Sequence, residues 1–151
     1  MPGERTAVRL EPVTQENVRA VCDLRVAPAQ ESFVAPNAVS LAEAYVYPEA
    51  CCRAVYAGDD LVGFVILHDV PTGPGYMLWR LMIDARFQGR GLGRAVVERV
   101  VDHVRTRPDA TVLKVGAHRG EGGPGPFYET LGFRATGEVI DGEEDVYALR
   151  L

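Results

Sequence analysis

The sequence lacks the features that would place the chain in a membrane, on nucleic acid or in an oxidising compartment. No apolar run approaches the ~18 residues that a membrane-spanning helix needs, and residues 1–5 contain no signal-peptide core. The net charge of −5 argues against a strongly basic, nucleic-acid-binding face. The three cysteines, Cys22, Cys51 and Cys52, are odd in number and lack metal-ligand spacing. We therefore expect a cytoplasmic protein that contacts neither membrane nor nucleic acid.

Two catalytic devices are also missing from the sequence. Ser32 and Ser40 are the only serines, and neither lies in the glycine-bounded turn of a nucleophile elbow. His68, His103 and His118 are too scattered along the chain to propose a metal site. We therefore expect neither a covalent seryl intermediate nor a metal ion.

The composition is that of one compact domain. Apolar residues make up 47% of the 151 residues and charged residues 25%, which are ordinary values for a globular protein. A chain of this length buries roughly 68–70% of its unfolded surface, enough for one core. Because no repeat or linker divides the chain, we predict a single domain over residues 1–151.

Apolar periodicity and turn residues predict an order of alternating strands and helices. Thr14 is the predicted N-cap of the first helix. The expected strands cover residues 6–13, 53–57, 61–67, 76–83, 111–115, 133–139 and 145–151, and the expected helices cover residues 14–24, 40–46, 92–104 and 124–131.

The most informative segment is glycine-rich and lies between the strand at 76–83 and the helix at 92–104. It reads Gln88-Gly89-Arg90-Gly91-Leu92-Gly93. Glycines let a backbone turn tightly and approach a ligand closely. The N-terminus of the following helix offers unpaired N–H groups and a positive dipole end to an anion. The segment therefore predicts a loop that binds phosphate or pyrophosphate.

Charge placement supports an anion at this loop. Residues 86–107 carry a local charge of +4, so the remainder of the chain carries −9. Arg90 and Arg94 lie where the helix dipole disfavours cations by about 0.3 kcal/mol or more, a penalty that a bound anion would reverse. The alternative is a structural turn with solvated arginines. Arg94 stands where a Walker loop needs lysine, and the G-x-G-x-G spacing does not fit a dinucleotide fingerprint.

The segment resembles the Gln/Arg-x-x-Gly-x-Gly/Ala signature of the GNAT superfamily of N-acetyltransferases. A second GNAT-like element follows at residues 127–133, which read Phe-Tyr-Glu-Thr-Leu-Gly-Phe. The patterns at residues 30–44 and 80–84 resemble those of bacterial spermine/spermidine (diamine) acetyltransferases. The resemblance implies the GNAT fold, an α/β (α+β) fold. Its mixed, mostly antiparallel central sheet has six to seven strands, with about four helices on its faces.

The resemblance also assigns roles to residues and names acetyl-CoA as co-substrate. It makes Tyr128 the acid that protonates the CoA thiolate, since a phenol with a pKa of about 10 keeps its proton at neutral pH. The alternative for Tyr128 is a packed ring with its hydroxyl at the surface. Glu121 stands near the position of an asparagine that helps many family members to seat the cofactor. The implied cofactor-binding residues are Leu81, Met82 and Ile83 for the pantetheine arm, and Gln88, Gly89, Arg90, Gly91, Leu92, Gly93 and Arg94 for the pyrophosphate.

The sequence leaves the general base and the amine open. The candidate bases are Glu31, Glu43, Asp84 and His118, and each carboxylate is otherwise a solvated surface group. The charge of −9 outside the basic segment favours a cationic substrate such as a polyamine. The candidate substrate-binding residues are Glu31, Glu43, Asp84 and Glu143, with Glu49 as a further channel residue.

Several alternatives to a polyamine acetyltransferase stay open. The acceptor could be an aminoglycoside, an amino acid or a protein N-terminus, all of which present an amine. A non-catalytic module that binds acyl-CoA is a second class of function. The resemblance further implies a homodimer.

Overall fold

The computed structural model describes residues 7–151, so the beginning of the first expected strand lies outside the described residues. Within that range the chain forms one seven-stranded sheet, four α-helices and two 3₁₀ turns. The strands are β1 (Arg9–Pro12), β2 (Ala50–Ala57), β3 (Asp60–His68), β4 (Met77–Ile83), β5 (Val112–His118), β6 (Arg134–Ile140) and β7 (Glu144–Arg150). The helices are α1 (Val18–Asp23), α2 (Asn37–Val46), α3 (Leu92–Arg105) and α4 (Gly125–Thr130), and the 3₁₀ turns are η1 (Pro28–Phe33) and η2 (Ala85–Phe87).

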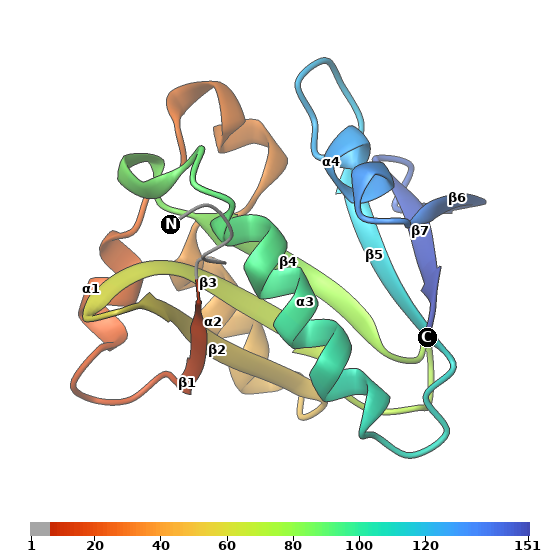
Figure 1. Cartoon of the computed structure of the whole chain (residues 1–151), viewed down its shortest axis with the longest axis horizontal. Helices are drawn as coiled ribbons and strands as arrows, with labels where there is room; N and C mark the ends of the chain where they lie inside the picture. Colours follow the sequence, from red (N-terminus) through yellow and green to blue (C-terminus); the bar gives the residue numbers. More distant parts are fainter. Residues whose placement is uncertain (1–6) are drawn as a thin grey trace.

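The sheet has the strand order β1-β2-β3-β4-β5-β7-β6, and every neighbouring pair is antiparallel except β4 and β5. The prediction of a mixed, mostly antiparallel sheet is therefore confirmed. The parallel pair is short, because only Met77 with Lys114 and Leu78 with Val115 are in register. Figure 1 shows β4 and β5 diverging from this point toward α4. The sheet thus opens into a gap between its two halves.

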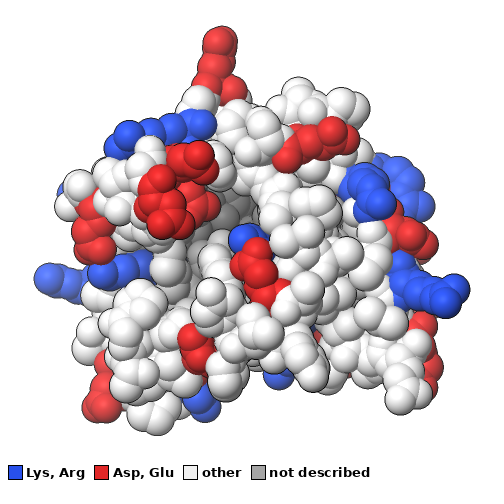
Figure 2. All heavy atoms as spheres, turned by 180° about the vertical axis from the view of Figure 1, so that it is seen from behind, with Lys and Arg blue, Asp and Glu red and all other residues white. Residues whose placement is uncertain are grey.

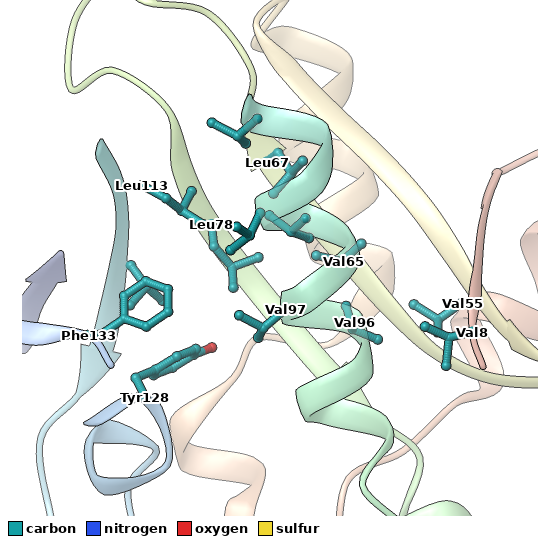
Figure 3. Close-up of a cluster of buried hydrophobic side chains, with 14 of the residues drawn as sticks. Val8, Val55, Val65, Leu67, Leu78, Val96, Val97, Leu113, Tyr128 and Phe133 are labelled. Atoms are coloured by element: carbon teal, nitrogen blue, oxygen red, sulfur yellow. The ribbon is translucent and has the colours of Figure 1, made fainter. Parts of the chain in front are cut away.

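Helix α3 covers one face of the sheet across β3 and β4 (Figure 1). Its apolar residues recur at helical spacing, and six of them are buried: Leu92, Val96, Val97, Val100, Val101 and Val104. They pack against Val65, Leu67 and Leu78 of the sheet (Figure 3). This core fixes α3, and with it the glycine loop, against the strand that leads into the loop.

Helices α1 and α2 cover the other face of β2, β3 and β4. Val21 and Leu24 pack there against Phe64, Ile66 and Met82. Strand β3 is therefore buried on both faces, which explains its nearly continuous apolar sequence.

The prediction of Thr14 as a helix N-cap is wrong. Helix α1 begins at Val18, and residues 14–17 form a turn in which Asn17 donates its backbone N–H to the Thr14 carbonyl. The Asn17 side chain accepts from the Thr14 N–H at 2.7 Å and donates to the Pro12 carbonyl at 3.1 Å. Such local side-chain hydrogen bonds compete with the first turn of a helix. Similarly, α2 begins at Asn37 rather than Ser40.

Candidate functional site

The site is organised by the gap between β4 and β5. A bulge places one extra residue, Trp79, between the partners of Ile66 and Leu67 on β3. Beyond Leu78 the edge of β4 that faces β5 has no strand partner. An unpaired strand edge offers backbone donors and acceptors to an extended ligand.

A first cavity of about 470 Å³ lies between this edge and the beginning of α3. It brings together every predicted cofactor-binding residue except Arg90: Leu81, Met82, Ile83, Gln88, Gly89, Gly91, Leu92, Gly93 and Arg94. Arg90 places its guanidinium over the Phe87 ring, 5.6 Å from the ring centre. The two sequence segments predicted to hold one cofactor therefore line one cavity.

The glycine loop has the backbone conformation that its sequence predicts. Gly89 and Gly91 have φ values of 77° and 76°, in the left-handed region that favours glycine. Gly91 is the N-cap of α3, so the first residues of the helix lie beside the cavity with N–H groups that have no intrahelical partner. Gly93 serves a different purpose, because a Cβ there would come within 3.2 Å of the Phe127 ring. It lets α4 pack close to α3.

Hydrogen bonds of two side chains, Gln88 and Asp84, stabilise the loop. Gln88 donates to the Ile83 carbonyl at 2.9 Å and to the side-chain oxygen of Gln30 at 2.7 Å. Asp84 accepts from the Arg25 N–H at 2.9 Å, the Arg86 N–H at 3.0 Å and Arg86 Nε at 2.8 Å. Burial alone would raise the pKa of Asp84, but the hydrogen bonds from Arg86 and Arg25 hold it below its usual value.

Asp84 was a candidate base and substrate ligand, and its geometry gives it neither contact. Its carboxylate is engaged by three donors and lines neither the first cavity nor the second one described below. In this structure the carboxylate of Asp84 caps η2 and holds the loop in place.

Tyr128 projects from α4 toward α3 and β4 (Figure 3). Its ring makes edge contacts with Phe127 and Phe133, at ring-centre distances of 5.1 and 5.6 Å. The residue is only 5% exposed, so the alternative of a hydroxyl at the outer surface does not hold. Burial raises the pKa of Tyr128, and the charge of Glu144 raises it further. The phenol therefore keeps its proton at neutral pH.

A second cavity of about 340 Å³ lies on the α2 side of the gap. It shares Phe33, Val34, Leu81, Pro124 and Tyr128 with the first cavity, so the two meet at the gap. Figure 2 shows the face opposite α3 hollowed near its centre, with both acidic and basic side chains around the hollow. The charged or titratable residues that line the second cavity are Glu31, Arg80, His118, Tyr128 and Glu144.

Of the remaining predicted acids, one lines the second cavity and three line neither cavity. Glu31 lines the second cavity, whereas Glu43 forms an ion pair with Arg80 at 3.2 Å and lines neither cavity. The Glu143 side chain is 70% exposed and lies 3.7 Å from His118, outside both cavities. Glu49 also lines neither cavity.

Glu144 is the residue of this cavity that sequence reasoning missed. It begins β7 directly opposite His118 of β5, and its carboxylate lies over Gly116, where a Cβ would come within 3.0 Å of Oε2. Burial raises the pKa of Glu144, while the charges of His118 and Arg80 oppose the rise. The expected strand began at residue 145; a strand one residue longer, paired with β5, would have placed Glu144 in the site.

Glu121 does not contact the cavities. It is exposed at the tip of the loop before α4, and Gly122, Gly123 and Pro124 line the first cavity in its place. Two glycines and a proline, rather than the Glu121 side chain, therefore face the cavity at this position. Among residues 7–151, no three histidine, cysteine or acidic side chains are arranged to hold a metal ion.

Comparisons with known proteins agree with this geometry. The model of the Acetyltransferase (GNAT) family matches residues 18–133. A curated relative, the spermine/spermidine N(1)-acetyltransferase of Bacillus subtilis, is 26% identical over 145 residues, which cover 91% of this chain and 95% of the relative.

Two solved structures show the same fold. A GNAT family acetyltransferase from Elizabethkingia anophelis with acetyl-CoA bound has a TM-score of 0.67 at 15% identity, covering 97% of this chain and 100% of its own. The PaiA N-acetyltransferase from Thermoplasma acidophilum, in complex with coenzyme A, has a TM-score of 0.68 at 12% identity, covering 96% of this chain and 99% of its own. Within the described residues, every helix is too short or too polar to cross a bilayer.

Proposed function

The chain belongs to the GNAT family of acetyltransferases, and we propose that it transfers the acetyl group of acetyl-CoA to a primary amine of a polyamine such as spermidine or spermine. One observation carries the proposal. The signature loop at Gly89 and Gly91 and the hydroxyl-bearing Tyr128 line one cavity at the gap in the sheet. A second, acidic cavity meets the first at Tyr128.

The first cavity suits acetyl-CoA as the donor substrate. The unpaired edge of β4 at Leu81 and Ile83 offers backbone groups to an extended amide chain such as pantetheine. The N–H groups at the beginning of α3 and the helix dipole favour the pyrophosphate. The basic segment around Arg94 adds positive charge on the same side.

The two connected cavities support direct transfer within a ternary complex. The neutral amine attacks the acetyl carbonyl carbon from the second cavity, and the carbon–sulfur bond then breaks with its electron pair on sulfur. Tyr128 gives its proton to that sulfur, because a buried phenol is neutral at physiological pH and lies where the cavities meet. No covalent enzyme intermediate is needed.

The charge of the second cavity supports a cationic acceptor. Glu31 and Glu144 line it, while its Arg80 is already paired with Glu43. Outside residues 86–107 the chain carries −9, which attracts a polycation over long range. The curated Bacillus subtilis relative is named for spermine and spermidine.

The test is release of CoA thiol from acetyl-CoA in the presence of single amines. We expect saturable turnover with spermidine or spermine, with a KM in the range of about 1 μM–1 mM. Aminoglycosides, free amino acids and peptide N-termini serve as competing acceptors, and a diol of matched length serves as a control without an amine. If no amine raises thiol release while acetyl-CoA still raises the melting temperature, the chain is an acyl-CoA-binding module instead.

The proposal includes a homodimer in the cytoplasm. Closed twofold dimers are the commonest assemblies of soluble proteins. All three cysteines are free, as a reducing compartment would keep them. Light scattering of the purified protein tests the dimer, and a monomeric mass across the micromolar range would contradict it.

A further inference from the structure

We propose that Glu144 is the general base of this site, accepting a proton from the ammonium group of the acceptor amine. The inference rests on the proposed acetyl transfer and names a residue for a step that the resemblance left open. It is argued from the position of the carboxylate, from the engagement of the competing acids and from the charges around it.

The position of Glu144 is set by the pairing of β5 and β7. Register places it across from His118 at the edge of the second cavity, and the missing side chain at Gly116 leaves space for its carboxylate. Tyr128 lines the same cavity, and the charge of Glu144 reaches its hydroxyl strongly enough to raise the Tyr128 pKa. An amine nitrogen that approaches the gap from this cavity therefore enters a space lined by both residues.

The other candidate carboxylates are engaged or displaced. Asp84 accepts three hydrogen bonds, and Glu43 is held by Arg80. Glu143 lies outside the cavity beside His118, and Glu31 is exposed on η1. Glu144 is half-buried in the cavity, and its carboxylate forms no hydrogen bond with any described residue. Of the two carboxylates that line the second cavity, Glu31 and Glu144, it is thus the half-buried one that remains available to a substrate.

The charged and titratable groups that face Glu144 come from four elements and one turn. From β5 and β4, His118 and Arg80 lower its pKa; from the β6–β7 turn, Asp141 and Glu143 raise it. From α4, Tyr128 contributes a neutral phenol, and Glu31 faces the cavity from η1.

The two cations are themselves shared with other carboxylates. Arg80 lies 3.2 Å from Glu43 and donates to Ser40, and His118 lies 3.7 Å from Glu143. Burial therefore prevails, and the pKa of Glu144 stands above its usual value. A carboxylate with a raised pKa is a stronger base, closer to the pH at which the enzyme operates.

The protons of the reaction balance with this assignment. The ammonium group loses one proton to the Glu144 carboxylate, which releases it to water, and the freed lone pair forms the carbon–nitrogen bond. The attacking nitrogen loses its second proton as the amide forms. Tyr128 protonates the departing sulfur, and the second proton from nitrogen restores the phenol through solvent. The net products are the acetylated amine, CoA thiol and one proton.

The experiment compares Glu144→Gln with the native chain in the thiol-release assay across pH. In the native enzyme, kcat falls as pH drops through the raised pKa of Glu144, because the base must be ionised. In Glu144→Gln we expect kcat at neutral pH to fall about 100-fold or more. The variant should recover rate as pH approaches the pKa of the amine, about 10, where the substrate is already neutral.

Matched variants separate a catalytic role from a structural one. Glu129→Gln changes the same residue type on the exposed face of α4, outside both cavities, and should leave the profile unchanged. Glu144→Asp should keep the acid limb at a reduced kcat, because a carboxylate is still present. Acetyl-CoA affinity, measured by calorimetry, should stay within twofold in every variant.

The outcomes distinguish this inference from the proposed function. If the native enzyme turns over but Glu144→Gln keeps its kcat and its acid limb, Glu144 is not the base and the acetyl transfer stands. If the native enzyme turns over no amine, both proposals are wrong. If Glu144→Gln does not fold, an unchanged acid limb and kcat in Glu144→Asp would overturn the inference in its place.

Discussion

Removing the hydroxyl of Tyr128 tests the central chemical step with little disturbance of the fold. The ring packs by its edges against Phe127 and Phe133, and phenylalanine keeps those contacts. The hydroxyl forms no hydrogen bond with any described residue, and burial raises its pKa, with a further contribution from Glu144. Tyr128→Phe therefore deletes a proton donor while leaving no partner unsatisfied.

The expected effect on rate follows from the role of the acid. Positioned proton transfer contributes about 10²–10⁴-fold to catalysis. A 100-fold loss of kcat corresponds to about 2.7 kcal/mol of barrier height. The free energy of unfolding, in contrast to the rate, should not fall in this variant. Because the hydroxyl has no partner among the described residues and faces a cavity, its removal leaves no group unsatisfied, and the variant should be unchanged or up to about 1 kcal/mol more stable.

The assay combines steady-state thiol release with calorimetric binding of acetyl-CoA and a thermal melt. We expect a lower kcat, a dissociation constant for acetyl-CoA within twofold of native, and a melting temperature that does not fall. Tyr45→Phe is the matched control, since Tyr45 is 91% exposed on α2. A Tyr128→Phe variant that retains kcat within twofold would refute the acid role.

Three glycine substitutions probe the remaining geometry. Gly116→Ala places a Cβ 3.0 Å from the Glu144 carboxylate, and a pH–rate profile should show kcat reduced several-fold with acetyl-CoA affinity intact; unchanged kcat would contradict the placement of that carboxylate. Gly91→Ala puts alanine at φ 76°, at a cost of roughly 1–2 kcal/mol. We expect the free loop to relieve this strain by leaving the binding conformation, which binding must then restore, so calorimetry should show acetyl-CoA binding about tenfold weaker. Equal affinity would contradict a backbone-built pyrophosphate loop. Gly63→Ala brings a Cβ within 2.4 Å of the Met82 carbonyl oxygen. At about 3 kcal/mol it should lower the melting temperature by roughly 6–12 °C, and a shift under 2 °C would count against the tight β3–β4 packing.

The parts of the fold that could be predicted are those that local periodicity determines. The apolar spacing of α3 gave its buried face because each residue there contacts the same sheet. The first helix shows the limit of this reasoning. Thr14 has the residue type of an N-cap, yet the amide of Asn17 bonds to Thr14 and Pro12 and delays the helix to Val18. Competition between two local hydrogen-bonding patterns is decided by tertiary contacts, here including a hydrogen bond from Asn17 to Tyr56.

In the candidate site, too, the part built from local sequence could be predicted and the part built from contacts between distant elements could not. The donor side is built from contiguous segments, so the residues around Gly91 and Tyr128 could be named from their motifs. The acceptor side depends on which carboxylates are engaged by cations, and that is set by contacts between distant elements. Glu43 is removed from the site by Arg80, which lies on another element, and Glu144 enters it through the register of β5 and β7. Residue type and spacing carry no information about either contact.

The geometry of the gap also bears on the order of the chemistry. Leu81, Pro124 and Tyr128 line both cavities, so the thioester on the α3 side and the amine on the α2 side can reach each other only where β4 and β5 separate. The proposed acid lies at that junction, and the proposed base lies on the acceptor side of it. In the proposed reaction, the nitrogen that has given its proton to Glu144 therefore meets the carbonyl carbon before the sulfur leaves toward Tyr128. In the proposed reaction the base and the acid act on opposite sides of one carbon, so we expect both substrates to be bound together and no acetylated residue to form.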